Sequence, residues 1–184
     1  YSVVLKDYGI KAELTATPRV GFQRYTFPKS DSSYMIFDIG NKLGESGEVK
    51  DASVKYLGNG IVEGWVITYP EYVKKYQPGG VVKMFFSGKI NKTPQEIGTF
   101  KGLDKFADQS EINGKGAGLY LKFNTKEEET VEFKSGFSYT SIENARLNLK
   151  EEAENLNFDE AKALAQQVWA KELGKIKVSG SWEE

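Results

Sequence analysis

The sequence predicts a mainly β protein, an antiparallel β-sandwich with connecting helices at its C-terminal end. Apolar and polar side chains alternate with a period of two through much of residues 1–140, which is typical of half-buried strands. Turn signals rich in Gly, Pro and Asn separate these short runs, as in a sandwich. From residue 141 onward the apolar spacing changes to three and four, which predicts amphipathic helices.

The predicted strands follow one another closely along the chain. Residues 1–5 are already strand-like, and the next run alternates so that Ala12 and Leu14 share an apolar face while Glu13 lies on the other. Gly58, Asn59 and Gly60 form a tight turn signal, which predicts a hairpin between its neighbouring runs. The strands are expected at residues 10–17, 20–27, 34–39, 52–56, 61–68, 81–87, 119–123 and 131–139. The connections 69–80 and 91–118 are long enough to hold further structure.

Two helices are expected after the last of these strands. Residues 143–156 are rich in Ala, Leu, Glu and Lys, and Ser141 is placed to cap their first turn. A second helix starts near Asn157 and ends at Gly174, a common terminating residue. Alternation returns over 175–182 and predicts one more strand. We therefore divide the chain into a β-sandwich domain, 1–140, and a helical extension with a final strand, 141–184.

Composition excludes several classes of protein. The 184 residues carry a net charge of −1, and this lacks the basic excess expected of a nucleic-acid partner. No run of 18 apolar residues is present, so the sequence predicts no membrane span. There are no cysteines and no histidines. Disulfides, zinc thiolate sites and Ser-His-Asp triads are therefore excluded, and we expect no metal site and no complete catalytic centre in this chain.

Two arginines are candidate substrate-binding residues. Arg19 and Arg24 stand close to aromatic residues in the run from Thr17 to Pro28. Such a pair could face sugar hydroxyls or an interface. Alternatively, the run is a core strand whose arginines pair with carboxylates at its ends.

Trp65 is the third candidate for substrate binding, and Tyr69, Tyr72 and Tyr76 follow it. The apolar face of a pyranose packs on an aromatic ring, so exposed aromatics on a sandwich would suit a carbohydrate-binding module. The alternative is a core or half-core position, where Trp and Tyr are commonly found.

Carboxylates and glycines give weaker signals. Glu127–Glu129 and the pair Glu151, Glu152 are charged runs, whereas glycosidases need two carboxylates set apart across a sugar. We interpret both runs as solvated. The glycine-rich segment 113–118 lacks the strand-then-helix context of a phosphate loop and is interpreted as a hairpin loop.

Four stretches resemble the N-terminal domain of glycoside hydrolase family 92, the exo-acting α-mannosidases common in gut Bacteroidetes. They are residues 8–17, 19–28, 136–149 and 158–180, and they occur in the family's order. The resemblance implies a supersandwich-like β-sandwich that packs on a C-terminal (α/α)6 catalytic barrel of the same polypeptide. It implies that the barrel carries the catalytic acid and base and a calcium ion, and that the anomeric centre is inverted.

The resemblance also sets the expected role of this chain. We expect a fragment of a longer protein, beginning at Tyr1 rather than Met, with an N-terminal part of the sandwich missing and inactive alone. It is expected to pack on the barrel, with Trp169 at the interdomain contact, and to help shape a pocket for a mannose-containing glycan. The family is usually exported to the periplasm or cell surface. Rival interpretations are an autonomous carbohydrate-binding module and a purely structural spacer domain.

Overall fold

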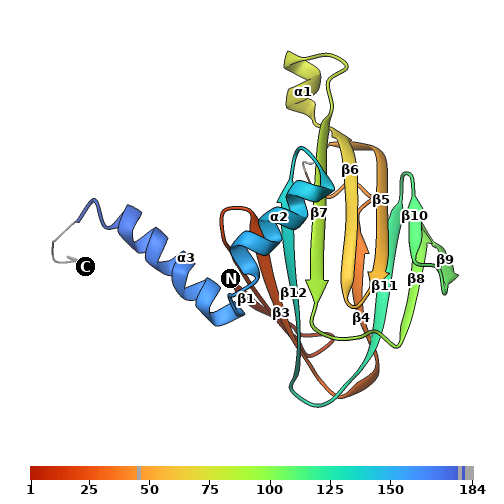
Figure 1. Ribbon diagram of the computed structural model, residues 1–184, viewed down its shortest axis with the longest axis horizontal. Coiled ribbons are helices and arrows are strands. Elements are labelled where there is room, and N and C mark those ends of the chain that lie inside the picture. Colours follow the sequence, from red (N-terminus) through yellow and green to blue (C-terminus); the bar gives the residue numbers. More distant parts are fainter. Residues whose placement is uncertain (45–46, 178–179, 181–184) are drawn as a thin grey trace.

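The chain forms two antiparallel β-sheets that pack face to face, with two helices on one outer surface (Figure 1). The computed structural model describes residues 1–44, 47–177 and 180. The eight-stranded sheet, here sheet A, has the order β1-β2-β3-β12-β7-β6-β5-β10, and the four-stranded sheet B has the order β4-β11-β8-β9. The prediction of an antiparallel sandwich with C-terminal helices is confirmed.

The elements have the following bounds. Sheet A contains β1 Ser2–Leu5, β2 Ile10–Ala16, β3 Val20–Phe27, β5 Glu48–Gly58, β6 Ile61–Tyr69, β7 Val82–Ile90, β10 Glu111–Asn113 and β12 Glu129–Ser138. Sheet B contains β4 Ser30–Asp38, β8 Glu96–Lys101, β9 Asp104–Ala107 and β11 Ala117–Thr125. The helices are α1 Glu71–Tyr76, α2 Ile142–Ala153 and α3 Phe158–Leu173.

The main core lies between the two sheets. Leu119, Leu121 and Phe123 alternate along β11 and are fully buried, as their period of two predicts. They pack with apolar residues of sheet A such as Val62 and Val131. Burial of each of these side chains contributes roughly 1.5–3 kcal/mol to the free energy of folding. This interior therefore holds the sandwich together.

The predicted hairpin joins β5 to β6. Asn59 and Gly60 both have positive φ, 51° and 78°, as a two-residue turn between right-twisted strands requires. A Cβ at Gly60 would also lie 2.3 Å from the carbonyl oxygen of Ile90. Both the backbone angle and the space therefore call for glycine at this position.

The long connections contain short elements. The first of them, 69–80, holds α1, and the second, 91–118, holds β8, β9 and β10. β8 and β9 complete sheet B, whereas β10 pairs with β5 at the edge of sheet A. These segments have few apolar residues in alternation, so their strands depend on neighbours distant in sequence.

The two C-terminal helices begin at defined caps. The Ser141 side chain accepts a hydrogen bond from the Asn144 N–H at 3.1 Å, as predicted. Asn157 and Glu160 form a reciprocal capping box at the start of α3. α2 ends at Ala153, earlier than expected, and α3 ends before Gly174.

A second, smaller core lies under these helices. Val20 and Phe22 point outward from β3 and are buried by Ala153, Phe158 and Ala161. Helices α2 and α3 thus cover part of the outer face of sheet A, where they contact β12, β7, β3 and β2. The helical extension is packed on the sandwich through α2 and the first turn of α3.

The cover by α3 changes the exposure of β2. Glu13 is buried and Leu14 is exposed, the reverse of the expectation from alternation. Glu13 lies on the outer face, where α3 contacts β2. Leu14 lies on the inner face, near the sheet edge formed by β1 and β2.

The expected final strand over 175–182 falls largely outside the described residues. Of this range the structure describes 175–177 and 180, and residues 174–176 form a turn and bend after α3. No helix in the described parts of the chain has the length and apolar character needed to cross a membrane.

Candidate functional site

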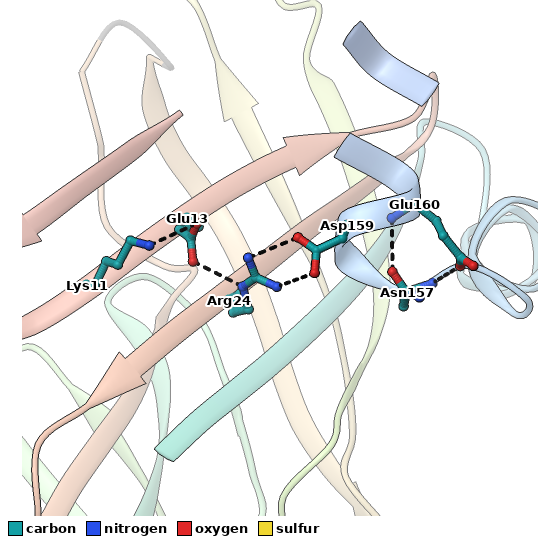
Figure 2. A network of polar contacts seen from close by, with 6 residues as sticks. All are labelled: Lys11, Glu13, Arg24, Asn157, Asp159 and Glu160. Atoms are coloured by element: carbon teal, nitrogen blue, oxygen red, sulfur yellow. Dashed lines mark hydrogen bonds and ion pairs between the residues drawn. The ribbon is translucent and has the colours of Figure 1, made fainter. Parts of the chain in front are cut away.

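The outer face of sheet A, with α2 and α3, gathers most of the side chains that the sequence singles out. Arg24 projects from β3 toward the start of α3 (Figure 2). Its Nε donates to Glu13 at 3.0 Å, and its two terminal nitrogens donate to Asp159 at 2.9 and 3.1 Å. The guanidinium also lies 4.2 Å from the centre of the Phe158 ring. Arg24 therefore ties two strands to the first turn of α3.

The charged groups of this cluster stabilise one another. Hydrogen bonds from Arg24 hold the pKa of Asp159 and of Glu13 below the usual carboxyl values, although burial works against this at both. Lys11 lies 3.2 Å from Glu13 on the other side (Figure 2). The same figure shows the capping box of Asn157 and Glu160 beside it. The direction of α3 is thus fixed by a cap and by a bidentate ion pair.

Arg19 makes a second tie, to the end of α2. Its Nε lies 2.5 Å from Oε1 of Glu152, and its backbone N–H donates to Oε2 at 3.0 Å. The Thr17 hydroxyl donates to the same carboxylate at 2.5 Å. Burial raises the pKa of Glu152, but these hydrogen bonds outweigh it and leave that pKa below its usual value. Both candidate arginines are thus engaged with carboxylates of the helical extension, and their role in substrate binding stays a prediction.

A third tie was not identified from the sequence. Glu63 in β6 is only 1% exposed, and Arg146 of α2 donates to both of its oxygens at 2.6 and 2.7 Å. The Ser87 hydroxyl donates to it at 2.9 Å. Burial raises the pKa of Glu63, while these partners lower it, and the lowering prevails. In the sequence, this tie is indicated only by a single acid inside the apolar run 61–68.

Trp65 lies on the same outer face, two residues along β6 from Glu63. The indole is half-buried beside its cross-strand neighbour Phe85. The ammonium group of Lys83 lies 4.6 Å from the centre of the indole and 4.9 Å from that of Phe85. One face of Trp65 is therefore occupied by a cation–π contact, and the structure does not bring Trp65 together with Arg19 or Arg24.

The tyrosines that follow Trp65 are dispersed. Tyr69 is half-buried and its hydroxyl accepts the Gly79 N–H at 2.9 Å. Tyr72 and Tyr76 are exposed on α1, at the end of the sandwich (Figure 1). They do not form a continuous platform with Trp65.

Trp169 lies in the second half of α3, where every residue from Gln166 to Leu173 is exposed. Its own exposure is 66%, and Val168 and Leu173 are exposed to a similar degree. Figure 1 shows this half of α3 projecting away from the two sheets. An apolar surface of this kind on a projecting helix suits a contact with another part of a protein.

Comparison with known families identifies the fold. Residues 1–138 match the model of the glycosyl hydrolase family 92 N-terminal domain. The chain belongs to this family. The match covers β1 to β12 and ends just before α2. A comparison with curated proteins gives no match.

Solved structures of family 92 members align with almost the whole chain. The family GH92 α-mannosidase BT3965 of Bacteroides thetaiotaomicron gives a TM-score of 0.87 at 26% identity, over 98% of this chain and 24% of that one. Its complex with mannoimidazole gives 0.86 at 26% identity, over 98% and 23%. The inverting mannosidase BT2199 from the same species shares the fold, with a TM-score of 0.83 at 21% identity, over 99% and 23%. This family 92 domain therefore spans about a quarter of the length of these relatives.

The family resemblance implies a calcium ion. A hard cation such as calcium takes six to eight oxygen ligands, with several from carboxylates. Within residues 1–44, 47–177 and 180, no three acidic side chains are grouped closely enough to hold a metal. The residues described in this domain therefore do not fit the ion.

Proposed function

We propose that this domain is a non-catalytic N-terminal part of an α-mannosidase-like glycoside hydrolase, which packs on an (α/α)6 catalytic barrel of the same polypeptide. We further propose that it helps to shape the pocket for a mannose-containing glycan. The observation that carries the proposal is the group of exposed apolar side chains in the second half of α3, namely Val168, Trp169 and Leu173, on a helix that projects from a domain of this family.

The three ties described above support this role. Arg19, Arg24 and Glu63 each bind the helical extension to sheet A by charged hydrogen bonds. Such bonds are directional and are shorter and stronger than neutral ones. They hold α2 and α3 in one orientation on the sandwich. A fixed orientation is what a linker between two parts of an active site requires.

The calcium ion, the inversion of configuration and the catalytic acid and base belong, in this proposal, to the barrel. Export to the periplasm or cell surface is likewise part of the proposal and rests on the family alone. The domain by itself is proposed to be inactive toward mannosides.

Activity on an aryl α-mannoside with calcium tests the proposal. The 184-residue chain and a polypeptide extended through a barrel are compared under the same conditions. We expect turnover by the extended polypeptide alone. Turnover by the 184-residue chain would overturn the non-catalytic role.

Association of the separate parts tests the packing. The 184-residue chain is titrated with a separately produced barrel, and Trp169→Ala is expected to weaken the association at least tenfold while leaving the thermal midpoint of the domain unchanged. Leu57→Ala, which removes an exposed apolar side chain at the end of β5, is the matched control. Equal affinity for Trp169→Ala and the wild type would refute docking through α3.

A further inference from the structure

The outer face of sheet B carries an open groove with a volume of about 940 Å³. It is lined by residues of β4, β8 and β11, together with residues around the β1–β2 and β8–β9 turns. The lining is mostly apolar and aromatic, with Tyr34, Ile36, Phe100 and Tyr120 at its centre. Because α2 and α3 pack on sheet A, this groove faces away from the helical extension.

Two of the aromatic rings lie flat on the sheet. A Cβ at Gly118 would be 2.0 Å from Cζ of Phe100 and 2.4 Å from both of its Cε atoms. These distances put the glycine under the face of the ring rather than beside its edge. Tyr120 covers Gly98 in a similar way. A Cβ at Gly98 would lie 2.3 Å from both Cζ and the hydroxyl oxygen of Tyr120. With one face on the backbone, each ring turns its other face outward.

A third ring stands against this floor. Tyr34 lies 6.1 Å from Tyr120, centre to centre, at an angle of 63°, and is 44% exposed. Ile36 follows on the same strand and is 63% exposed. The groove thus has a flat aromatic floor and an aromatic side wall, a shape that accepts a flat, ring-shaped group.

Polar groups accompany the rings. The Glu96 carboxylate accepts hydrogen bonds from the Tyr120 hydroxyl at 3.2 Å and from Lys122 at 3.3 Å. Ser32 and Lys105 also line the groove. The lining itself carries one carboxylate, Glu96, and one ammonium group, Lys105, so the groove has no strong preference for an anion or a cation. A few polar groups around apolar walls are typical of ligand sites.

We propose that this groove binds a neutral saccharide. A pyranose has an apolar face of C–H groups, which packs on an aromatic ring, and a rim of hydroxyls, which pairs with Glu96, Ser32 and the tyrosine hydroxyls. A purely apolar protein partner would remove water from the Glu96 carboxylate without offering it a new hydrogen-bond donor, which is costly. That the sugar contains mannose rests on the proposed function, whereas the stacking geometry does not.

Titration of the 184-residue chain with a linear manno-oligosaccharide of three to five units tests this site. Calorimetry and amide chemical shifts are followed together. We expect saturable binding in the millimolar range or tighter, with shifts concentrated in β4, β8 and β11. Tyr34→Ala, which changes an exposed ring, is expected to weaken binding at least tenfold. Tyr139→Ala, which removes an exposed tyrosine ring outside the groove, is the matched control and is expected to leave the affinity unchanged.

The outcomes separate this site from the proposed function. Binding to this chain that Tyr34→Ala weakens supports the site even if an extended polypeptide proves inactive. Binding of a cello-oligosaccharide instead, with the same dependence on Tyr34, supports a saccharide site and points away from mannose. No binding of either sugar, or loss of binding with Tyr139→Ala alone, overturns it. Self-association abolished by Ile36→Glu, with no sugar binding, would overturn it in favour of docking between proteins.

Discussion

Arg146 in α2 donates two hydrogen bonds to the almost fully buried carboxylate of Glu63 in β6, at 2.6 and 2.7 Å. This pair joins the first helix of the extension to the middle of sheet A. The carboxylate has one further side-chain partner, Ser87, so its charge depends mainly on the arginine.

We therefore predict that Arg146→Met destabilises the domain by about 2–3 kcal/mol, because it leaves a buried charge with too few partners. Urea denaturation measures the change. Lys150→Met, at an exposed cation on the same helix, is expected to change stability by less than about 0.5 kcal/mol. Adding Glu63→Gln to Arg146→Met should recover part of the loss, and equal losses for the two methionine variants would contradict the prediction.

The close approach of α2 to β12 depends on Gly136. A Cβ there would lie 2.4 Å from the Ala145 carbonyl oxygen and 2.7 Å from the Leu149 nitrogen. Gly136→Ala should push the helix backbone away and cost about 1–3 kcal/mol. The control is Gly21→Ala on the neighbouring strand, where the nearest atom would be 3.4 Å away. Comparable thermal midpoints for the two variants would argue against this tight contact.

The ion pairs give stability a defined pH dependence. The pKa values of Glu13, Glu63, Glu152 and Asp159 all lie below their ordinary values. A carboxyl with a lowered native pKa contributes stability above its unfolded pKa, 4.5 for glutamate, and that contribution is lost as the pH falls through the native value. The chain has no histidine, so we expect stability to vary little between about pH 6 and pH 8.

Urea midpoints measured from neutral pH down to about pH 3 check this dependence. Stability should fall steadily once the pH drops below about 5. Arg24→Met should show a shallower fall, since Glu13 and Asp159 then lose the partner that lowers their pKa. A midpoint that rises on acidification would show that these carboxylates are not stabilised by their partners.

The Arg24 cluster should control the order of α3. With Arg24→Met, the first turn of α3 loses its bidentate partner at Asp159 and the cation over Phe158. We expect amide exchange to accelerate in α3 and to stay unchanged in β11, with a global loss of about 1–2 kcal/mol. Lys162→Met, an exposed change within α3, serves as the control. Unchanged exchange in α3 of the Arg24 variant would rule out the tie.

Local patterns predicted most elements but not their assembly. The period of two in residues 119–123 and the turn at Gly58–Gly60 each depend on neighbours in sequence, and both were predicted. Which sheet a strand joins depends on distant partners, as β10 shows by pairing with β5. Burial of Glu13 could not be predicted because its cover comes from α3, about 145 residues downstream.

The candidate site shows the same division. The sequence drew attention to both arginines and suggested carboxylates as partners, but it could not say that Glu152 and Asp159 on two helices would supply them. The role of Glu63 cannot be predicted from the sequence, because a single acid in an apolar run gives no local indication of its partner. The groove on sheet B was missed for a similar reason, since Tyr34, Phe100 and Tyr120 come from three segments far apart in the chain.

The projecting half of α3 acts mechanically as a lever. An α-helix advances about 1.5 Å per residue, so the sixteen residues of α3 span about 24 Å. A tilt of about 10° at Phe158 would displace the last turn by about 4 Å. Misplacement of reacting groups by about 1 Å can slow catalysis a hundredfold. In an enzyme built from this domain, a substitution at Arg24 would therefore reduce activity by changing the direction of α3.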